Sequence, residues 1–258
     1  MILFDLKSLG TLTTGFLIKR QNRFLATVKV DEKIQKAHIA DTGRLEEILT
    51  PNRELLLLKN RDGLKTDFTL IAAKMEEGWV LINTKLHPVI AGNAIENGVL
   101  GFKPKELKRE VKFLNSRFDY YFKTSKSDFE QDKSPNKRTS FSKKTTSKSD
   151  FEVEGFVELK GCSLVEDGFC LFPNAPTSRG VKHIKELIEA KKKGYESYIL
   201  IMAVRKCRCF KPHPTRDEEF KKIFYKALKE GVKFRGFFVK IDEDLKVVYN
   251  GELWLCED

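Results

Sequence analysis

The sequence predicts two domains, a small β-barrel followed by an α/β domain. Residues 12–82 contain about five short strand signals separated by turns. From about residue 84 the pattern changes, and strands then alternate with helices, which is typical of an α/β domain. At 258 residues the chain is long enough for one large domain or for two of ordinary size.

The strands of the first domain are expected in short apolar runs at residues 16–18, 24–28, 55–58, 68–71 and 79–82. One short helix is predicted between them, from Arg44 to Leu49, because Asp41-Thr42-Gly43 can open it and Pro51 can end it. About five strands with one helix inserted midway suit an OB-type barrel, which is a common platform for nucleic acids.

In the second domain, strands are expected at residues 110–114, 117–122 and 156–160. A helix over 182–193 follows, with Gly194 as its C-cap. The continuous apolar run 198–204 indicates a strand that is buried on both faces. A second helix is predicted over 217–230, because Thr215 and Glu218 have the spacing of a capping box. The final strands are expected at 232–241 and 246–255.

Residues 123–151 differ in composition from the rest of the chain. Lys, Ser and Thr dominate this segment, and its few apolar residues cannot offset the entropy of ordering it. A heptapeptide beginning at Thr124 also recurs from Thr146. We predict a mobile basic insertion in a hairpin that is free to contact phosphates without sequence preference.

The charge balance indicates a polyanionic partner. The formal net charge is +11 and the pI is about 9.3, so nucleic acid is the first candidate, although a lysine-rich solvated surface has the same composition.

No apolar run approaches the ~20 residues that a membrane span requires. The N-terminus lacks a signal peptide, and the five cysteines have no framework spacing, which together predict reduced thiols in a cytoplasm. Cys207 and Cys209 lack the partners of a zinc site and are interpreted as structural.

Three residues carry the most specific chemistry: Asp119, Glu158 and Lys160. Two carboxylates that share a hard cation, with a lysine beside one of them, are what metal-assisted phosphodiester cleavage requires. The lysine can orient the attacking water or neutralise charge that develops on the phosphate. Because Asp5-Leu6-Lys7, Asp244-Leu245-Lys246 and other copies of acid-x-Lys occur in this chain, the tripeptide alone is weak evidence and its bland interpretation is a solvated ion pair.

The surroundings of Glu158 and Lys160 strengthen the hypothesis. Both lie in a mostly apolar predicted strand and, two residues apart, share one face of it. Buried charges are costly unless they are paired or bind metal. In the strand around Asp119, we expect Phe118, Tyr120 and Phe122 on one face and Arg117, Asp119 and Tyr121 on the other. Glu110, at the start of the preceding strand, is the third candidate carboxylate.

Five segments occur in an order that identifies a family. They are Arg20-Gln21-Asn22-Arg23-Phe24-Leu25, residues 38–45 (HIADTGRL), residues 116–119 (SRFD), residues 158–164 (ELKGCSL) and residues 172–183 (FPNAPTSRGVKH). Together they resemble the sugar fermentation stimulation protein A family over nearly the whole chain. Position 174 is Asn where the family usually has Asp, and position 178 is Ser where some members have Glu.

The resemblance implies an OB-fold domain at residues 1–83 and a restriction-endonuclease-like PD-(D/E)xK mixed-sheet domain with flanking helices at 84–258. It also implies DNA binding without strong sequence preference and a regulatory role in sugar (maltose) metabolism. The family's metal site carries over to Asp119, Glu158 and Lys160, with Glu110 as an additional acid and with Mg²⁺ or Mn²⁺ as the cofactor of a catalytic protein.

Basic residues near these segments are candidates for contacts with nucleic acid. Thr177 and Gly180 lie just before a helix whose first amides can hold a phosphate, helped by Arg179 and Lys182. An ordinary N-cap with solvated bases is the alternative. His183 is a candidate proton donor, although a packed helix histidine is more common. The remaining candidates are Arg20, Arg23, Arg44 and Arg117.

Two hypotheses from different classes follow. The first is a Mg²⁺- or Mn²⁺-dependent DNA endonuclease or exonuclease, and the second is a DNA-binding regulator that keeps the nuclease fold as a non-catalytic scaffold. An adaptor whose basic insertion recruits a protein is a third alternative. The expected partner is single- or double-stranded DNA, with no membrane, and a homodimer is left open.

Overall fold

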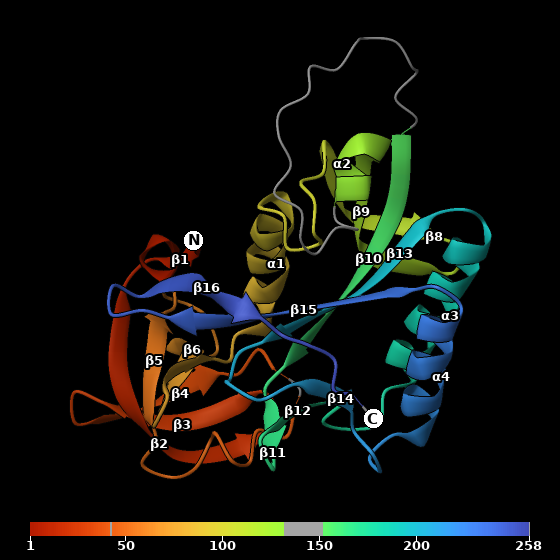
Figure 1. The fold of residues 1–258 in the computed structure, drawn as a ribbon. Helices are drawn as coiled ribbons and strands as arrows, with labels where there is room; N and C mark the ends of the chain where they lie inside the picture. The colour runs from red at the N-terminus through yellow and green to blue at the C-terminus, as the bar shows by residue number, and fades with distance from the viewer. Residues whose placement is uncertain (42, 132–151, 258) are drawn as a thin grey trace.

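The computed structural model contains two parts, a β-barrel and a larger mixed sheet flanked by helices (Figure 1). It describes residues 1–41, 43–131 and 152–257. The predicted fold, an OB-type barrel followed by a mixed-sheet domain, is therefore confirmed. Most of the predicted insertion, residues 132–151, lies outside the described residues; its first described residues end strand β9 and form the short helix α2 (Lys126–Gln131).

The barrel is built from six strands in the order β4-β3-β2-β5-β6-β7. A parallel pairing of β4 with β6, at Ala37 opposite Phe68, closes it. Alternation fixes which side chains face inward: Ala26, Val28 and Val30 of β3 are buried between half-exposed neighbours. The strands are β2 (Leu12–Asn22), β3 (Leu25–Val30), β4 (Lys33–His38), β5 (Glu54–Lys59), β6 (Phe68–Met75) and β7 (Gly78–Leu81).

The helix predicted from Arg44 to Leu49 is wrong, because this segment forms a turn. Leu45 is fully buried and has a φ of 51°, a left-handed conformation that interrupts a right-handed helix at its second residue. The guanidinium of Arg20 donates hydrogen bonds to the carbonyls of Gly43, at 2.8 Å, and Arg44. A side chain from strand β2 thus satisfies carbonyls of the turn.

Seven strands form the larger sheet, in the order β1-β16-β15-β13-β10-β9-β8. Strands β10, β13 and β15 run parallel at its centre, and the outer strands are antiparallel. The predicted strand at 198–204 is the buried β13, whose residues from Ser197 onward are all buried. The strands are β1 (Ile2–Asp5), β8 (Glu106–Phe113), β9 (Ser116–Ser125), β10 (Glu152–Cys162), β13 (Glu196–Ala203), β15 (Lys233–Ile241) and β16 (Lys246–Glu252).

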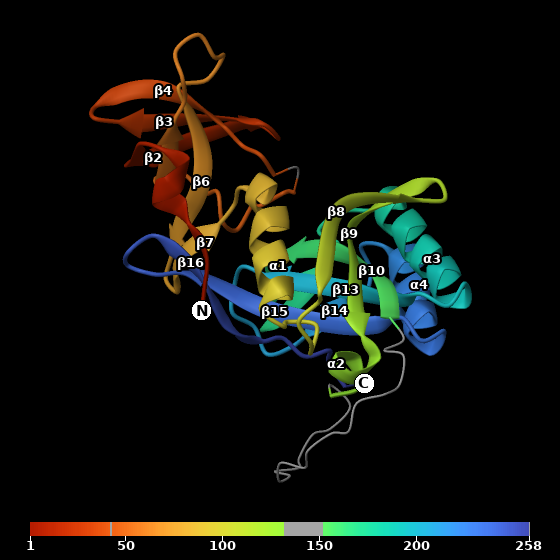
Figure 2. The same ribbon diagram turned by 90° about the horizontal axis from the view of Figure 1, so that it is seen from above.

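Strand β1 joins the sheet of the larger domain. It lies within the range 1–83 predicted for the barrel domain, yet it pairs antiparallel with β16 at the sheet edge. The barrel therefore follows a strand of the larger sheet and precedes helix α1 (His87–Glu96), which Figure 2 shows between the two parts. Two short 3-10 helices, Leu6–Leu9 and Thr84–Leu86, flank the barrel in the sequence.

Helices cover both faces of the larger sheet. Helices α3 (Ser178–Lys192) and α4 (Glu218–Lys229) pack on one face around a core that includes Phe118 and Ile199, and α1 packs on the other (Figure 2). The N-cap of α4 is Asp217, whose side chain accepts from the amide of Phe220 at 2.8 Å, so the capping box predicted from Thr215 and Glu218 is wrong. A small sheet of β11 (Leu164–Glu166), β12 (Phe169–Phe172) and β14 (Phe210–Pro212) completes the domain.

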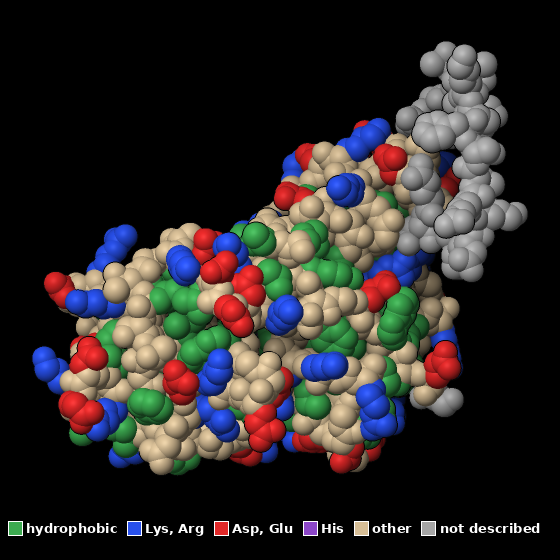
Figure 3. All heavy atoms as spheres, turned by 60° about the vertical axis from the view of Figure 1, so that its left-hand side comes forward, with side chains coloured by type: hydrophobic (Ala, Val, Ile, Leu, Met, Phe, Trp, Pro, Cys, Tyr) green, Lys and Arg blue, Asp and Glu red, His purple; other side chains and the backbone are tan. Residues whose placement is uncertain are grey.

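Charged side chains of both signs are interspersed on the barrel side of the surface (Figure 3). The net charge of +11 therefore does not form a single basic patch on this face. None of the helices in the described ranges is long and apolar enough to cross a membrane.

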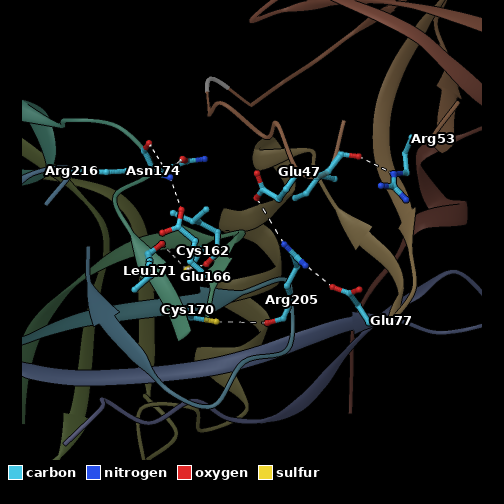
Figure 4. Close-up of polar contacts among 12 residues, drawn as sticks. Glu47, Arg53, Glu77, Cys162, Glu166, Cys170, Leu171, Asn174, Arg205 and Arg216 are labelled. Carbon is cyan, nitrogen blue, oxygen red and sulfur yellow. Dashed lines mark hydrogen bonds and ion pairs between the residues drawn. The ribbon is translucent and has the colours of Figure 1, made fainter. Parts of the chain in front are cut away.

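Arg205 ties the two domains together. It follows β13, and its Nε donates to Oε1 of Glu77, in the turn between β6 and β7, at 2.8 Å (Figure 4). Glu47 of the barrel lies on its other side, 3.9 Å from Nη1. The arginine side chain is 15% exposed, but solvent reaches the two glutamates, which are 35% and 34% exposed, so the contact contributes modestly to docking.

The prediction of reduced thiols is wrong for four of the five cysteines. Cys170 is bonded to Cys207 and Cys209 to Cys256, while Cys162 is free and buried. The paired cysteines are 37 and 47 positions apart in sequence. They lie close together in space because the small sheet and the end of the chain bring their segments side by side. Local spacing carries no sign of such pairing.

The disulfides predict a specific thiol count. In protein prepared without reductant, we expect no reactive thiol in the folded state, because burial raises the pKa of the Cys162 thiol to about 12. Denaturation should expose one thiol per chain, and reduction should expose all five. Titration with a thiol reagent measures this count, and a Cys162→Ser variant should show none until it is reduced. Five thiols in denatured, unreduced protein would contradict the pairing.

Candidate functional site

Asp119 lies where strands β9 and β10 separate. The last paired residues are Tyr120 and Val157, and beyond them the Oδ2 atom of Asp119 accepts a hydrogen bond from the amide of Leu159 at 2.7 Å. The carboxylate thus takes the place of a backbone acceptor on β9. The bond holds Asp119 against the strand that carries Glu158 and Lys160.

The predicted alternation around Asp119 is wrong. Phe118 packs on the α3 side, with its ring 5.1 Å from that of Phe156, whereas Tyr120 and Phe122 join the core on the α1 side. The same change occurs on β8, where Leu107 packs on the α1 side of the sheet and Val111 packs on the α3 side. Between these two residues Glu110 has a φ of 56°, and this left-handed residue turns the hairpin so that its faces exchange.

Glu158 is buried on the α3 side of β10 and has two partners. It is 2% exposed, and its Oε1 accepts from Nζ of Lys160 at 2.5 Å and lies 2.5 Å from Nδ1 of His183. Burial alone would raise the pKa of this carboxyl, but the positive charge of Lys160 and the hydrogen bond with His183 outweigh burial and lower it. Glu158 is therefore held as a carboxylate.

The environment of Asp119 has the opposite effect. Burial, and then the negative charge of Glu158, raise the pKa of Asp119 to about 6, although Lys160 and the Leu159 amide act against the rise. The two carboxyl groups therefore lie close enough for their charges to repel one another, and a cation between them would relieve this repulsion. The buried Oε2 atom of Glu158 has no hydrogen-bond partner among the described residues, so an oxygen ligand is available there.

A cation bound by these two residues would need other ligands. The described parts of the chain hold no cluster of three or more His, Cys, Asp or Glu side chains arranged for a metal. Mg²⁺ commonly binds through one or two carboxylates together with waters and substrate phosphate, and the pair fits this pattern. The third predicted acid, Glu110, is 55% exposed and lies 3.6 Å from Arg117.

Asp119 opens into a cleft of about 920 Å³ between the barrel and the larger domain. The barrel contributes Arg20, Arg23 and Arg44 to its wall, and the larger domain contributes Asp119 and Thr177. Arg23 and Arg44 are exposed, and neither has an ion-pair partner in the described ranges. Four predicted residues from distant parts of the sequence thus line the same space as Asp119.

The other four predicted nucleic-acid contacts lie elsewhere. Arg117, Arg179, Lys182 and His183 line a second hollow of about 690 Å³, together with Glu110. The cleft and this hollow share no lining residue. The structure therefore brings the predicted residues together in two groups rather than one.

Comparison with known proteins settles the family. The family model described as "Sugar fermentation stimulation protein RE domain" matches residues 85–245, and "SfsA N-terminal OB domain" matches residues 18–82. The chain belongs to the sugar fermentation stimulation protein family. The resemblance inferred from the five sequence segments is therefore confirmed.

Similar members of the SfsA family come from archaea and bacteria. The homologue of Sulfolobus acidocaldarius is 34% identical over 93% of this chain and 88% of its own, and that of Methanococcoides burtonii is 36% identical over 94% and 91%. The Thermotoga maritima homologue is 32% identical over 95% and 96%. A solved structure, described as Pyrococcus furiosus SfsA in complex with Ca²⁺, matches all of both chains at 27% identity with a TM-score of 0.78.

Sequence reasoning missed a polar cluster at the cleft wall. Arg216 donates through Nη1 to the backbone oxygen of Asn174 at 3.2 Å and also to its side-chain oxygen, and its Nη2 donates to Glu166 at 2.5 Å (Figure 4). Asn174 is thus fixed by an arginine. Its position was the only signal in the sequence that pointed to this cluster.

His87 is a second residue that the sequence did not single out. It lies at the start of α1 against Gly161, where an added Cβ would come within 2.4 Å of its Nδ1 atom, so a glycine after Lys160 is a packing requirement. His87 also lines the cleft. Burial lowers the pKa of its imidazole to about 4, which keeps the ring neutral.

The lowered pKa of His87 predicts a pH-dependent stability. Between its unfolded pKa of 6.5 and its folded pKa of about 4, the unfolded chain binds a proton that the folded chain does not. The free energy of unfolding should therefore fall as the pH decreases through this window, by on the order of 3 kcal/mol. Denaturant unfolding at pH 7 and pH 4 measures the effect. His87→Gln should remove this contribution, and an unchanged pH dependence in that variant would contradict it.

Proposed function

We propose that this SfsA protein binds DNA in the cleft between its domains and hydrolyses the phosphodiester backbone with the help of a divalent cation. The supporting observation is that Asp119 shares the cleft with basic side chains of the OB-type barrel. A strand that these side chains hold by its phosphates has its backbone beside Asp119. The proposal unites the two parts of the fold in one activity.

Asp119 and Glu158 are the residues that would hold Mg²⁺ or Mn²⁺. The partnerless Oε2 of Glu158 supports this assignment, as does a relative described in complex with Ca²⁺, another hard cation that prefers oxygen ligands. When bound, the cation supplies positive charge for the phosphate and lowers the pKa of a water. Lys160, whose Nζ donates to Oε1 of Glu158 at 2.5 Å, would orient the attacking water or neutralise charge on the phosphate.

The arginines of the cleft have distinct roles. Arg20 donates to the carbonyls of Gly43 and Arg44, so its guanidinium shapes the loop that carries Arg44. Exposed Arg23 and Arg44 are available for DNA phosphates. Contacts of this kind position the DNA without reading its sequence, which agrees with binding of weak sequence preference.

Cleavage should depend on Asp119. Asp119→Asn keeps the shape of the side chain but removes its charge, so we expect cleavage of DNA with Mg²⁺ or Mn²⁺ to fall on the order of 100-fold or more. Single-stranded, duplex and branched DNA are the substrates to assay. The matched control is Asp244→Asn, in the exposed Asp244-Leu245-Lys246 copy of the tripeptide. Equal activity in the two variants would rule out the site.

Binding should depend on the exposed arginines of the barrel. Arg23→Ala and Arg44→Ala should each weaken the affinity for DNA of any sequence. Each should also reduce the slope of log Kd against log salt concentration by about one. Fluorescence anisotropy at several salt concentrations measures both effects. Arg61→Ala, in the loop between β5 and β6 and outside the cleft lining, is the control and should bind like the wild type.

A non-catalytic DNA-binding regulator of sugar (maltose) metabolism is the second candidate. The observation in its favour is that the carboxylates already have partners within the chain: Oε1 of Glu158 contacts Lys160 and His183, and Asp119 accepts from Leu159. A scaffold needs no further ligand. This candidate requires DNA binding that survives Asp119→Asn, with no turnover of any DNA in the wild type.

A further inference from the structure

The second hollow lies between the β8–β9 hairpin and the start of helix α3. Its walls come from both segments and are lined by Glu110, Lys112, Asn115, Ser116, Arg117, Ser178, Arg179, Lys182 and His183. Thr177, the N-cap of α3, lines the cleft, whereas the next residue, Ser178, lines the hollow. The first turn of α3 therefore separates the two spaces.

Positive charge is concentrated in this hollow. Four of its lining residues are basic and one, Glu110, is acidic. The acid lies 3.6 Å from Arg117, and Lys182 donates to the backbone oxygen of Asn115 at 2.8 Å. Lys112 and Arg179 have no acidic partner within the part of the chain that the structure describes. Basic side chains gathered in one concave space attract an anion.

Polar groups without partners point to the same conclusion. Ser116 is 8% exposed, yet its Oγ has no hydrogen-bond partner among the described residues, and an unsatisfied buried hydroxyl is costly unless a ligand completes it. At the start of α3, the hydroxyl oxygen of Thr177 accepts from the amide of Gly180, and its carbonyl accepts from the amide of Val181. The amides of Ser178 and Arg179 belong to the first turn of a 15-residue helix, where an anion is favoured.

His183 connects the hollow to the candidate metal site. The ring is 6% exposed and lines the hollow, and its Nδ1 lies 2.5 Å from Glu158. Ser116 precedes Asp119 by three residues on β9, which corresponds to roughly 10 Å along a strand. A group bound in the hollow would therefore lie close to the two carboxylates but outside the cleft.

We propose that the hollow is a phosphate-binding subsite that holds a second phosphate of the nucleic-acid strand, beside the phosphate at Asp119. Arg179, Lys112 and the hydroxyl of Ser116 bind its oxygens, together with the first amides of α3. The occupant is either a terminal phosphate monoester or an internal phosphodiester. Placing a nucleic-acid strand there rests on the proposed function, whereas phosphate binding by the hollow does not.

The first experiment tests the subsite without DNA or metal. The chain has four histidines, so the ring resonances of His183 are identifiable by NMR from a His183→Gln spectrum. Thymidine 5′-monophosphate, but not thymidine, should shift these resonances in a saturable way. Arg179→Ala and Ser116→Ala should weaken the effect about tenfold. Lys229→Ala, an exposed lysine on α4, should leave it unchanged. No shift in the folded wild type, or the same shift in Arg179→Ala, would overturn the proposal.

The second experiment identifies the source of the phosphate. Oligonucleotides with a 5′-phosphate or a 5′-hydroxyl are compared by anisotropy in EDTA, where no cleavage occurs. Tighter binding of the phosphorylated end, lost in Arg179→Ala, identifies a terminal phosphate. If Arg179→Ala lowers the affinity for both oligonucleotides equally, the bound group is an internal phosphodiester. Affinities unaffected by Arg179→Ala and Lys112→Ala would refute a strand contact here. A positive NMR result without DNA cleavage would leave the subsite standing and reject the nuclease.

Discussion

The hydrogen bond from the Leu159 amide to Asp119 is the constraint on which the site depends. It forms where β9 stops pairing with β10, and it holds an acid of one strand against the backbone of the other. Nearby, the left-handed Glu110 exchanges the faces of the hairpin. As a result Asp119 lines the cleft while Ser116 and Arg117, a few residues earlier on the same strand, line the hollow. Residues of one irregular hairpin thus line both binding spaces.

The cleft also depends on how the barrel is docked, because its two walls belong to different domains. Arg205 spans them by binding Glu77, and the segment that follows it is anchored by the Cys170–Cys207 disulfide. The side chain of Glu77 is 34% exposed, so loss of this ion pair should weaken the docking only modestly. The position of the barrel arginines relative to Asp119 depends on this contact and on the apolar core that the barrel shares with the larger sheet.

The sequence predicted the central strands and the family because their signals are local. Strand β13 is a continuous apolar run, and Glu158 with Lys160 lie two residues apart in a buried strand, as expected. The errors have distant causes. Leu45 adopts a left-handed conformation in a loop held by Arg20, and the disulfides join segments that meet only in the folded chain. The basic residues are divided between two spaces that meet near a hairpin with a left-handed residue, Glu110, inside strand β8, and no periodicity reveals that conformation.

The pairing of β1 with β16 has a consequence for the order of folding. The two strands come from opposite ends of the sequence, and one complete barrel and most of the larger domain lie between them. During synthesis, the barrel can form early, whereas β1 must wait until its partner has left the ribosome. Closing so long a loop costs entropy before any contact repays it, so this edge of the sheet is expected to form late. The cleft therefore acquires its barrel wall before the sheet that carries Asp119 is complete.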